Sequence, residues 1–109
     1  MATHTMAKSA LRRKLNLPSV NKKEVAHVLA ILEDYEQKHI SEPHRNIAMD
    51  MHLRFYFLAH KKVEPLEREK IVEYVYTLQR WKGYLDAISR KPLTWQHRFK
   101  ALISQDFDR

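Results

Sequence analysis

The chain has 109 residues and contains a single glycine, Gly83. All-β folds need many tight turns, and tight turns depend on glycine for backbone conformations that other residues avoid. The four prolines stand at breaks between segments whose apolar residues recur with helical spacing. We therefore predict an all-α fold in which short, proline-marked breaks join the helices.

The length and the apolar fraction of 44% are sufficient for one domain with its own hydrophobic core. The first residues lack helical periodicity, and chain termini without it are usually poorly ordered. We predict a flexible basic arm over residues 1–19 and a single helical domain over residues 20–109, built from four main helices.

Three local signals mark the beginning of the first of these helices. Asn21 is a favourable N-cap residue, Glu24 completes a capping box, and Val20 and Val25 occupy the two positions of a hydrophobic staple. We predict a helix from here to about His39. Its inner face would consist of Val25, Val28, Leu29, Leu32 and Tyr35.

The segment 43–62 is apolar on nearly all sides when it is wound as a helix, which is typical of a central, buried helix. One side carries Ile47, Ala48, Met51, Phe55, Leu58 and Ala59, which is an ordinary core stripe. The other side carries Met49, Leu53, Tyr56 and Phe57. We favour complete burial by the other helices. The alternative is that Met49, Tyr56 and Phe57 form a dimer or partner interface.

Two helices are predicted after Pro65. Apolar residues spaced by three and four indicate one continuous helix over 65–89, with Gly83 and Ala87 allowing another helix to approach closely. A C-cap at Gly83 is the competing interpretation. The last helix would run from a Thr94 cap to about Ser104, with Trp95, Phe99 and Leu102 facing inward.

The net charge of +7 is concentrated at the two ends of the chain. Residues 1–24 hold six basic residues against Glu24 alone, residues 25–89 hold nine against ten acidic ones, and residues 90–109 hold five against two. Positive charge gathered at the ends indicates an acidic partner, such as a phosphate backbone or an acidic protein surface.

Our leading hypothesis is a small nucleic-acid-binding protein of transcription or replication control, with DNA favoured over RNA. The helices on either side of residues 90–93 could form a helix-turn-helix-like element, although a packed last helix with a charged outer face is the alternative. Gln96 and Arg98 are the candidate base-reading residues, since such side chains recognise adenine and guanine. The candidate phosphate-contacting residues are Arg12, Arg13, Lys14, Arg90, Lys91 and Lys100.

The second hypothesis is an adaptor that binds an acidic protein. Leu11 and Leu15 could insert into a groove on the partner, with the basic residues of the arm around them. Met49, Tyr56 and Phe57 could supply an aromatic contact surface, and a homodimer is a further alternative on this side.

Other classes of function find little support in the sequence. The absence of cysteine excludes disulfides and thiolate chemistry, and His44, His52 and His60 are spaced so that they cannot face one metal ion. No catalytic motif and no bilayer-spanning segment is present, so we expect no enzyme activity, no metal, no cofactor and no membrane partner. We expect a cytoplasmic or nucleoid-associated protein. The acid-free beginning of the chain also resembles a mitochondrial presequence, which is the alternative.

Overall fold

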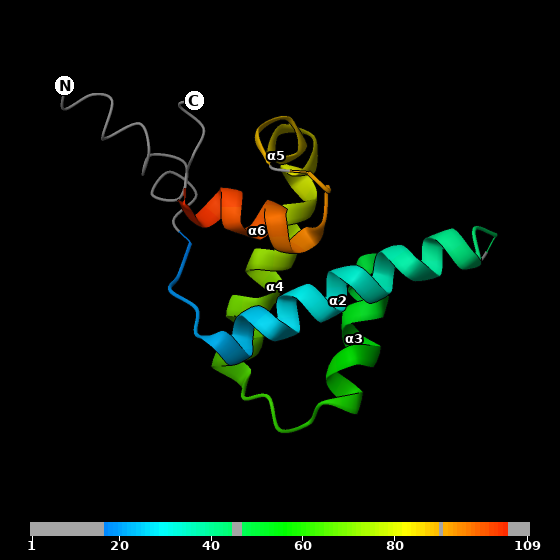
Figure 1. Cartoon of the computed structure of the whole chain (residues 1–109). Helices are drawn as coiled ribbons and strands as arrows, with labels where there is room; N and C mark the ends of the chain where they lie inside the picture. Colours follow the sequence, from blue (N-terminus) through cyan, green and yellow to red (C-terminus); the bar gives the residue numbers. More distant parts are fainter. Residues whose placement is uncertain (1–16, 45–46, 90, 105–109) are drawn as a thin grey trace. The chain divides into compact units, whose positions relative to one another are not determined.

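The structure is a computed structural model that describes residues 17–44, 47–89 and 91–104, and in this part of the chain all regular elements are helices (Figure 1). There are five of them, which confirms the predicted all-α class: α2 (Lys22–Ser41), α3 (Met49–Ala59), α4 (Pro65–Arg80), α5 (Lys82–Ile88) and α6 (Trp95–Ser104). None of these helices is both long enough and apolar enough to cross a bilayer.

The chain forms two compact units. One unit comprises residues 20–75, with α2, α3 and most of α4, and the described part of the other comprises residues 17–19 and 76–104, with the end of α4, α5 and α6. The predicted limits of an arm over 1–19 and a domain over 20–109 stay a prediction.

The beginning of α2 is the capping box that the sequence predicts. The Asn21 side-chain oxygen accepts a hydrogen bond from the Glu24 backbone N–H at 2.8 Å, and the Glu24 carboxylate accepts one from the Asn21 backbone N–H at 2.9 Å. The inner face of α2 buries Val28, Ile31 and Leu32 completely. Helix α2 packs against α3 in the unit 20–75.

Helix α3 is shorter than predicted and presents the opposite side to the core. It begins at Met49 rather than near Pro43, so Ile47 and Ala48 precede it, and it ends at Ala59. Met49 and Leu53 are buried, whereas Met51, Phe55 and Leu58 are 44%, 56% and 58% exposed. The predicted core stripe is therefore wrong, and so is the prediction that this helix is completely enclosed.

Polar contacts explain which side of α3 faces α2. His52 is buried, and its Nε2 lies 3.3 Å from the Ile31 carbonyl oxygen and 3.6 Å from an Asp34 carboxylate oxygen. One helical turn later the Tyr56 hydroxyl is hydrogen-bonded to Nδ1 of His27 at 2.6 Å. The two sides of α3 are similarly apolar, so hydrophobicity alone does not decide which side faces α2. His52 and Tyr56 need hydrogen-bond partners when they are buried, and the partners on α2 therefore determine the rotation of α3.

The predicted continuous helix over 65–89 is interrupted at Trp81, which separates α4 from α5. A Cβ atom placed on Gly83 would meet no other atom within 4 Å, so the predicted close approach of another helix is wrong. Gly83 lies inside α5 and does not have a positive φ, so it is not a C-cap either. A one-residue interruption preserves the spacing of the apolar residues, and the periodicity therefore does not reveal it.

Candidate nucleic-acid interface

The segment 76–104 is strongly basic. It contains six basic residues and one acidic residue, Asp86; the basic residues are Arg80, Lys82, Arg90, Lys91, Arg98 and Lys100. Helices α5 and α6 pack against each other and carry three of these residues: Lys82, Arg98 and Lys100. The positions of the charged side chains on these two helices determine what the segment can bind.

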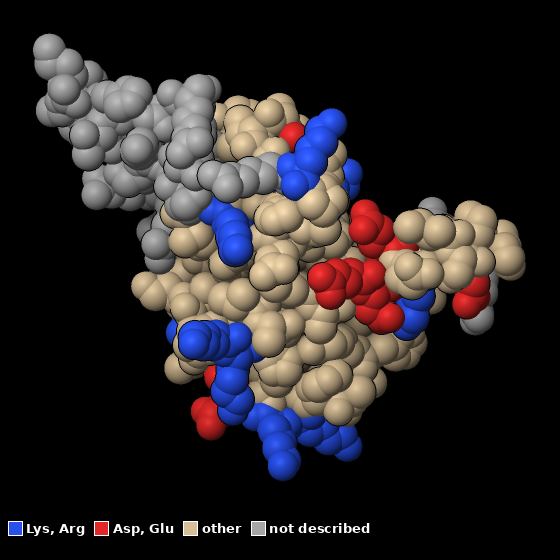
Figure 2. Space-filling view, in the orientation of Figure 1, with Lys and Arg blue, Asp and Glu red and all other residues tan. Residues whose placement is uncertain are grey.

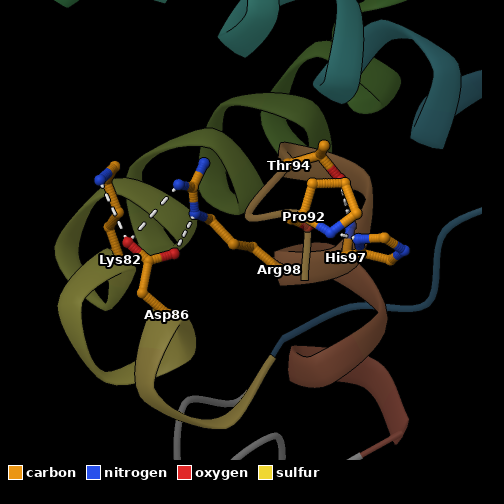
Figure 3. A network of polar contacts seen from close by, with 6 residues as sticks. All are labelled: Lys82, Asp86, Pro92, Thr94, His97 and Arg98. Atoms are coloured by element: carbon orange, nitrogen blue, oxygen red, sulfur yellow. Dashed lines mark hydrogen bonds and ion pairs between the residues drawn. The ribbon is translucent and has the colours of Figure 1, made fainter. Parts of the chain in front are cut away.

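The start of α6 is fixed by local hydrogen bonds (Figure 3). The Thr94 hydroxyl accepts a hydrogen bond from the His97 backbone N–H at 3.2 Å, as predicted for an N-cap residue. The His97 ring donates from Nδ1 to the Pro92 carbonyl oxygen at 2.7 Å. Together these two bonds set the direction in which α6 leaves the break at residues 91–94.

Asp86 of α5 is the centre of a polar network that joins α5 to α6 (Figure 3). Its carboxylate accepts hydrogen bonds from Nε and Nη2 of Arg98 and from Nζ of Lys82, the last at 3.2 Å. The Arg98 guanidinium carbon also lies 4.5 Å from the centre of the Trp95 ring. The arginine is thus held by an ion pair on one helix and an aromatic ring on its own helix.

The structure corrects the expectation that Arg98 is an exposed base-reading residue. Arg98 is only 4% exposed, and its charge is directed at Asp86. A charged side chain is buried at tolerable cost only when it is paired, and Asp86 is the single carboxylate that residues 76–104 provide. That lone acid in a basic segment is the signal in the sequence that could have indicated the pairing.

The network also perturbs the Asp86 carboxyl. Burial by itself would raise the pKa of Asp86, but the hydrogen bonds from Arg98 and Lys82 and their positive charges outweigh it and hold the pKa below its ordinary value. Asp86 therefore stays ionised at neutral pH. The only carboxylate of residues 76–104 is therefore paired with Lys82 and Arg98 of the same segment.

The other predicted contact residues have different placements. Lys91, Gln96 and Lys100 are exposed, and Gln96 and Lys100 lie one turn apart on α6. Lys91 and Lys100 make no ion pair with any residue that the structure describes. Six predicted site residues lie outside the described part of the chain: Leu11, Arg12, Arg13, Lys14, Leu15 and Arg90.

In the unit 20–75, charges of opposite sign are separated along α2. Figure 2 shows acidic side chains gathered over the middle of α2, and basic side chains near its beginning and around the α3–α4 connection. The exposed acids there include Glu33 and Asp34, and the basic residues include Lys22, Lys23, Lys61 and Lys62. This unit therefore combines acidic and basic regions, unlike residues 76–104.

The predicted aromatic contact surface is mostly occupied by contacts within the unit. Met49 is buried, Tyr56 is half-buried and stacks on His60 with ring centres 4.0 Å apart, and Phe57 is half-buried beneath the Arg68 guanidinium. The large apolar residues of α3 that are exposed are Met51, Phe55 and Leu58. The sequence shows that these three residues share one side of the helix. It does not show that this side faces solvent and the opposite side faces the core.

Within residues 17–44, 47–89 and 91–104 no group of three or more histidine, aspartate or glutamate side chains could hold a metal ion. Comparisons with protein-family models, with curated proteins and with solved structures found no match to this chain.

Proposed function

We propose that the protein is a small, non-enzymatic nucleic-acid-binding accessory protein that contacts the phosphate backbone through residues 76–104, with DNA favoured over RNA. The observation that carries the proposal is the charge balance of residues 76–104. The only carboxylate in this range, on Asp86, is paired with Lys82 and Arg98 of the same range. The other basic residues of this range that the structure describes, Arg80, Lys91 and Lys100, are exposed, and the range holds no second acid to neutralise them.

Three exposed residues are the proposed contacts in the described part of this unit. Lys91 and Lys100 would neutralise phosphates, which is the main source of affinity for nucleic acid. Gln96 is one turn from Lys100 and has the amide group that pairs with an adenine edge. Arg12, Arg13, Lys14 and Arg90 would add further phosphate contacts. The proposal places the protein in the cytoplasm or the nucleoid.

Arg98 has a different part in this proposal. Its pairing with Asp86 holds α6 against α5, so it positions Gln96 and Lys100 and does not touch the nucleic acid itself. The shared burial of Trp95, Arg98 and Phe99 makes the inner side of α6 structural. The outer side is left for binding.

The test is a titration of the whole chain against duplex DNA, single-stranded DNA and RNA at several salt concentrations. Fluorescence anisotropy measures the binding. Replacing Lys91 and Lys100 together by glutamine should weaken binding and reduce the slope of log K against log salt by about 1.8, since each phosphate contact contributes about 0.9. The slope should fall without loss of helix content, because both side chains are exposed.

Lys38→Gln is the matched control. Lys38 is also exposed and carries the same charge, but it lies on α2 and pairs with Asp34 at 3.3 Å. It should leave the slope unchanged. Absence of binding to all three nucleic acids at low salt would overturn the proposal. A decrease of the slope in Lys38→Gln about half as large as in the double variant would show that only net charge matters, because Lys38→Gln removes one charge and the double variant removes two.

A second function, an adaptor for an acidic protein, is favoured by the exposed apolar residues of α3. Met51, Phe55 and Leu58 follow the i, i+4, i+7 spacing of helices that bind a partner through one side. Two double variants separate the two proposals. An adaptor of this kind would still bind its protein partner in the Lys91→Gln/Lys100→Gln variant. It would lose that partner in a variant in which Phe55 and Leu58 are replaced by serine.

A further inference from the structure

A pocket of about 620 Å³ lies in the unit 20–75, between the beginning of α2, the end of α3 and the connection to α4. Its polar lining consists of Lys23, His27, His60, Lys61, Lys62 and Glu67. Leu58, Ala59 and Val63 supply apolar lining. Pockets that hold small organic ligands are commonly about 300–1,000 Å³ and combine an apolar wall with a few converging polar groups.

The charges that line this pocket are mostly positive and uncompensated. Lys23, Lys61 and Lys62 form no ion pair with any residue in the described ranges. The only acid of the lining is Glu67, and one of its carboxylate oxygens accepts a hydrogen bond from the Glu64 backbone N–H at 3.1 Å. The lining residues thus carry three positive charges against one negative charge, and an anion bound beside them would be attracted.

The two imidazoles are held by their Nδ1 atoms, which leaves the other ring nitrogen of each for a ligand. Nδ1 of His27 is hydrogen-bonded to the Tyr56 hydroxyl at 2.6 Å, and Nδ1 of His60 donates to the Tyr56 carbonyl oxygen at 2.8 Å. The ring centres are 5.6 Å apart. In the part of the chain that the structure describes, neither Nε2 atom has a hydrogen-bond partner.

The surroundings of His27 agree with a positive potential in the pocket. Burial lowers the pKa of His27 most, the neighbouring His60 lowers it further, Glu67 opposes the change, and Lys23 adds to it. An anion bound beside these groups would act in the opposite direction and favour the charged imidazolium. The histidines are therefore built-in reporters of whatever occupies the cavity.

We propose that this pocket binds the phosphate group of a small organic phosphate ester, with the ester's apolar body against Leu58, Ala59 and Val63. A phosphate dianion carries several acceptor oxygens, which suits three lysines and two histidines better than a carboxylate with two oxygens does, and each imidazole donates to it from Nε2 when that nitrogen carries a proton. The pocket lies in the unit 20–75, so this inference does not rest on the nucleic-acid contacts proposed for residues 76–104.

Isothermal titration calorimetry with phenyl phosphate as the probe tests the proposal directly. Phenyl phosphate combines the dianion with an apolar ring, so it should bind more tightly than inorganic phosphate, and benzyl alcohol should not bind. Replacing Lys61 and Lys62 by glutamine should weaken phenyl phosphate at least about tenfold, which corresponds to about 1.4 kcal/mol. Both lysines are exposed, so the variant should keep its helix content.

Arg54→Gln is the matched control for charge, because Arg54 is exposed on α3 and does not line the pocket. It should leave phenyl phosphate binding unchanged. NMR of the imidazole C–H resonances supplies a second readout that does not depend on a variant folding. Phenyl phosphate should shift the resonances of His27 and His60 and leave those of His97, on α6, unchanged.

Two results would overturn the proposal. The first is a loss of affinity in Arg54→Gln that is as large, per charge removed, as the loss in the Lys61→Gln/Lys62→Gln variant. The second is that the His27 and His60 resonances do not respond to phenyl phosphate, whether or not an oligonucleotide shifts them. The Lys91→Gln/Lys100→Gln variant should bind phenyl phosphate normally. The two proposals can therefore fail independently of each other.

Discussion

Arg98 and Lys100 show how differently two basic residues on one helix are used. Both lie on α6, but Arg98 is 4% exposed and paired with Asp86, whereas Lys100 faces solvent. The sequence indicates that both carry charge and does not indicate which of them a neighbouring helix will pair. A charged residue on the inner stripe beside Trp95 needs an acid within reach, and that requirement could have been recognised in advance.

Replacing Asp86 should destabilise the protein more than replacing an ordinary exposed charged residue, because Asp86 is the partner of the buried Arg98. Asp86→Asn would leave Arg98 buried opposite a neutral amide, and loss of one partner from a buried pair costs about 3 kcal/mol. The free energy of unfolding, measured by urea denaturation and circular dichroism, should fall by about that amount.

Lys82→Gln is the control at the same network. The Lys82 side chain is 44% exposed and also contacts Asp86, so its loss should cost less than about 1 kcal/mol. Similar losses for Asp86→Asn and Lys82→Gln would show that Arg98 reaches solvent when its partner is removed, and would contradict its structural role.

At the scale of single elements, the sequence predicts the start of α2 correctly but not the side of α3 that faces the core. The start of α2 follows from Asn21 and Glu24, which lie three residues apart and need no distant partner. The orientation of α3 depends on contacts with Ile31, Asp34 and His27 of α2, far away in the sequence. Neither side of α3 is polar enough for periodicity alone to decide between them.

Two truncations in α3 distinguish the observed orientation from the one that the sequence suggests. Leu53→Ala should lower the free energy of unfolding by about 2–4 kcal/mol because Leu53 is buried, whereas Phe55→Ala should cost less than about 1 kcal/mol because Phe55 is 56% exposed. Thermal and urea denaturation of both variants provide the measurement. A larger loss for Phe55→Ala than for Leu53→Ala would mean that α3 is rotated the other way.

At the scale of the whole molecule, the sequence shows that charge is distributed unequally along the chain. It does not show how many of these charges remain exposed after folding. Residues 76–104 are basic in any conformation, and this part of the candidate site could be predicted. The number of charges that remain exposed could not, because Asp86, Lys82 and Arg98 neutralise one another only after α5 and α6 have packed. The pocket beside His27 and His60 likewise depends on residues from three separate segments.

The pH dependence of folding should reflect both units. Burial lowers the pKa of His52, although Asp34 and the Ile31 carbonyl partly oppose it, and burial also lowers that of His27. Both folded-state values lie below 6.5, so the unfolded chain takes up protons first. Stability should therefore decrease as the pH falls below about 6.5, in a buffer without phosphate.

A second decrease should begin below about pH 4. The pKa of Asp86 is held below its ordinary value of 3.8, so the stability that its ionised form contributes is present above that pH and is lost as the pH falls through the lower, folded-state value. Urea denaturation across the pH range measures both steps. His27→Gln/His52→Gln should flatten the first step and leave the second, and a flat profile between about pH 7 and 5 in the unaltered chain would contradict the histidine assignment.

The capping box at the start of α2 also limits how the protein can be shortened. Glu24 is 2% exposed and uses the Asn21 backbone N–H as a partner, so this amide belongs to the folded structure. A chain that began at Asn21 would carry an α-ammonium group at that atom, and a positive charge there opposes the positive end of the helix dipole. A version made to separate residues 1–19 from the rest should therefore retain Val20, and preferably a residue before it, as a neutral lead-in to α2.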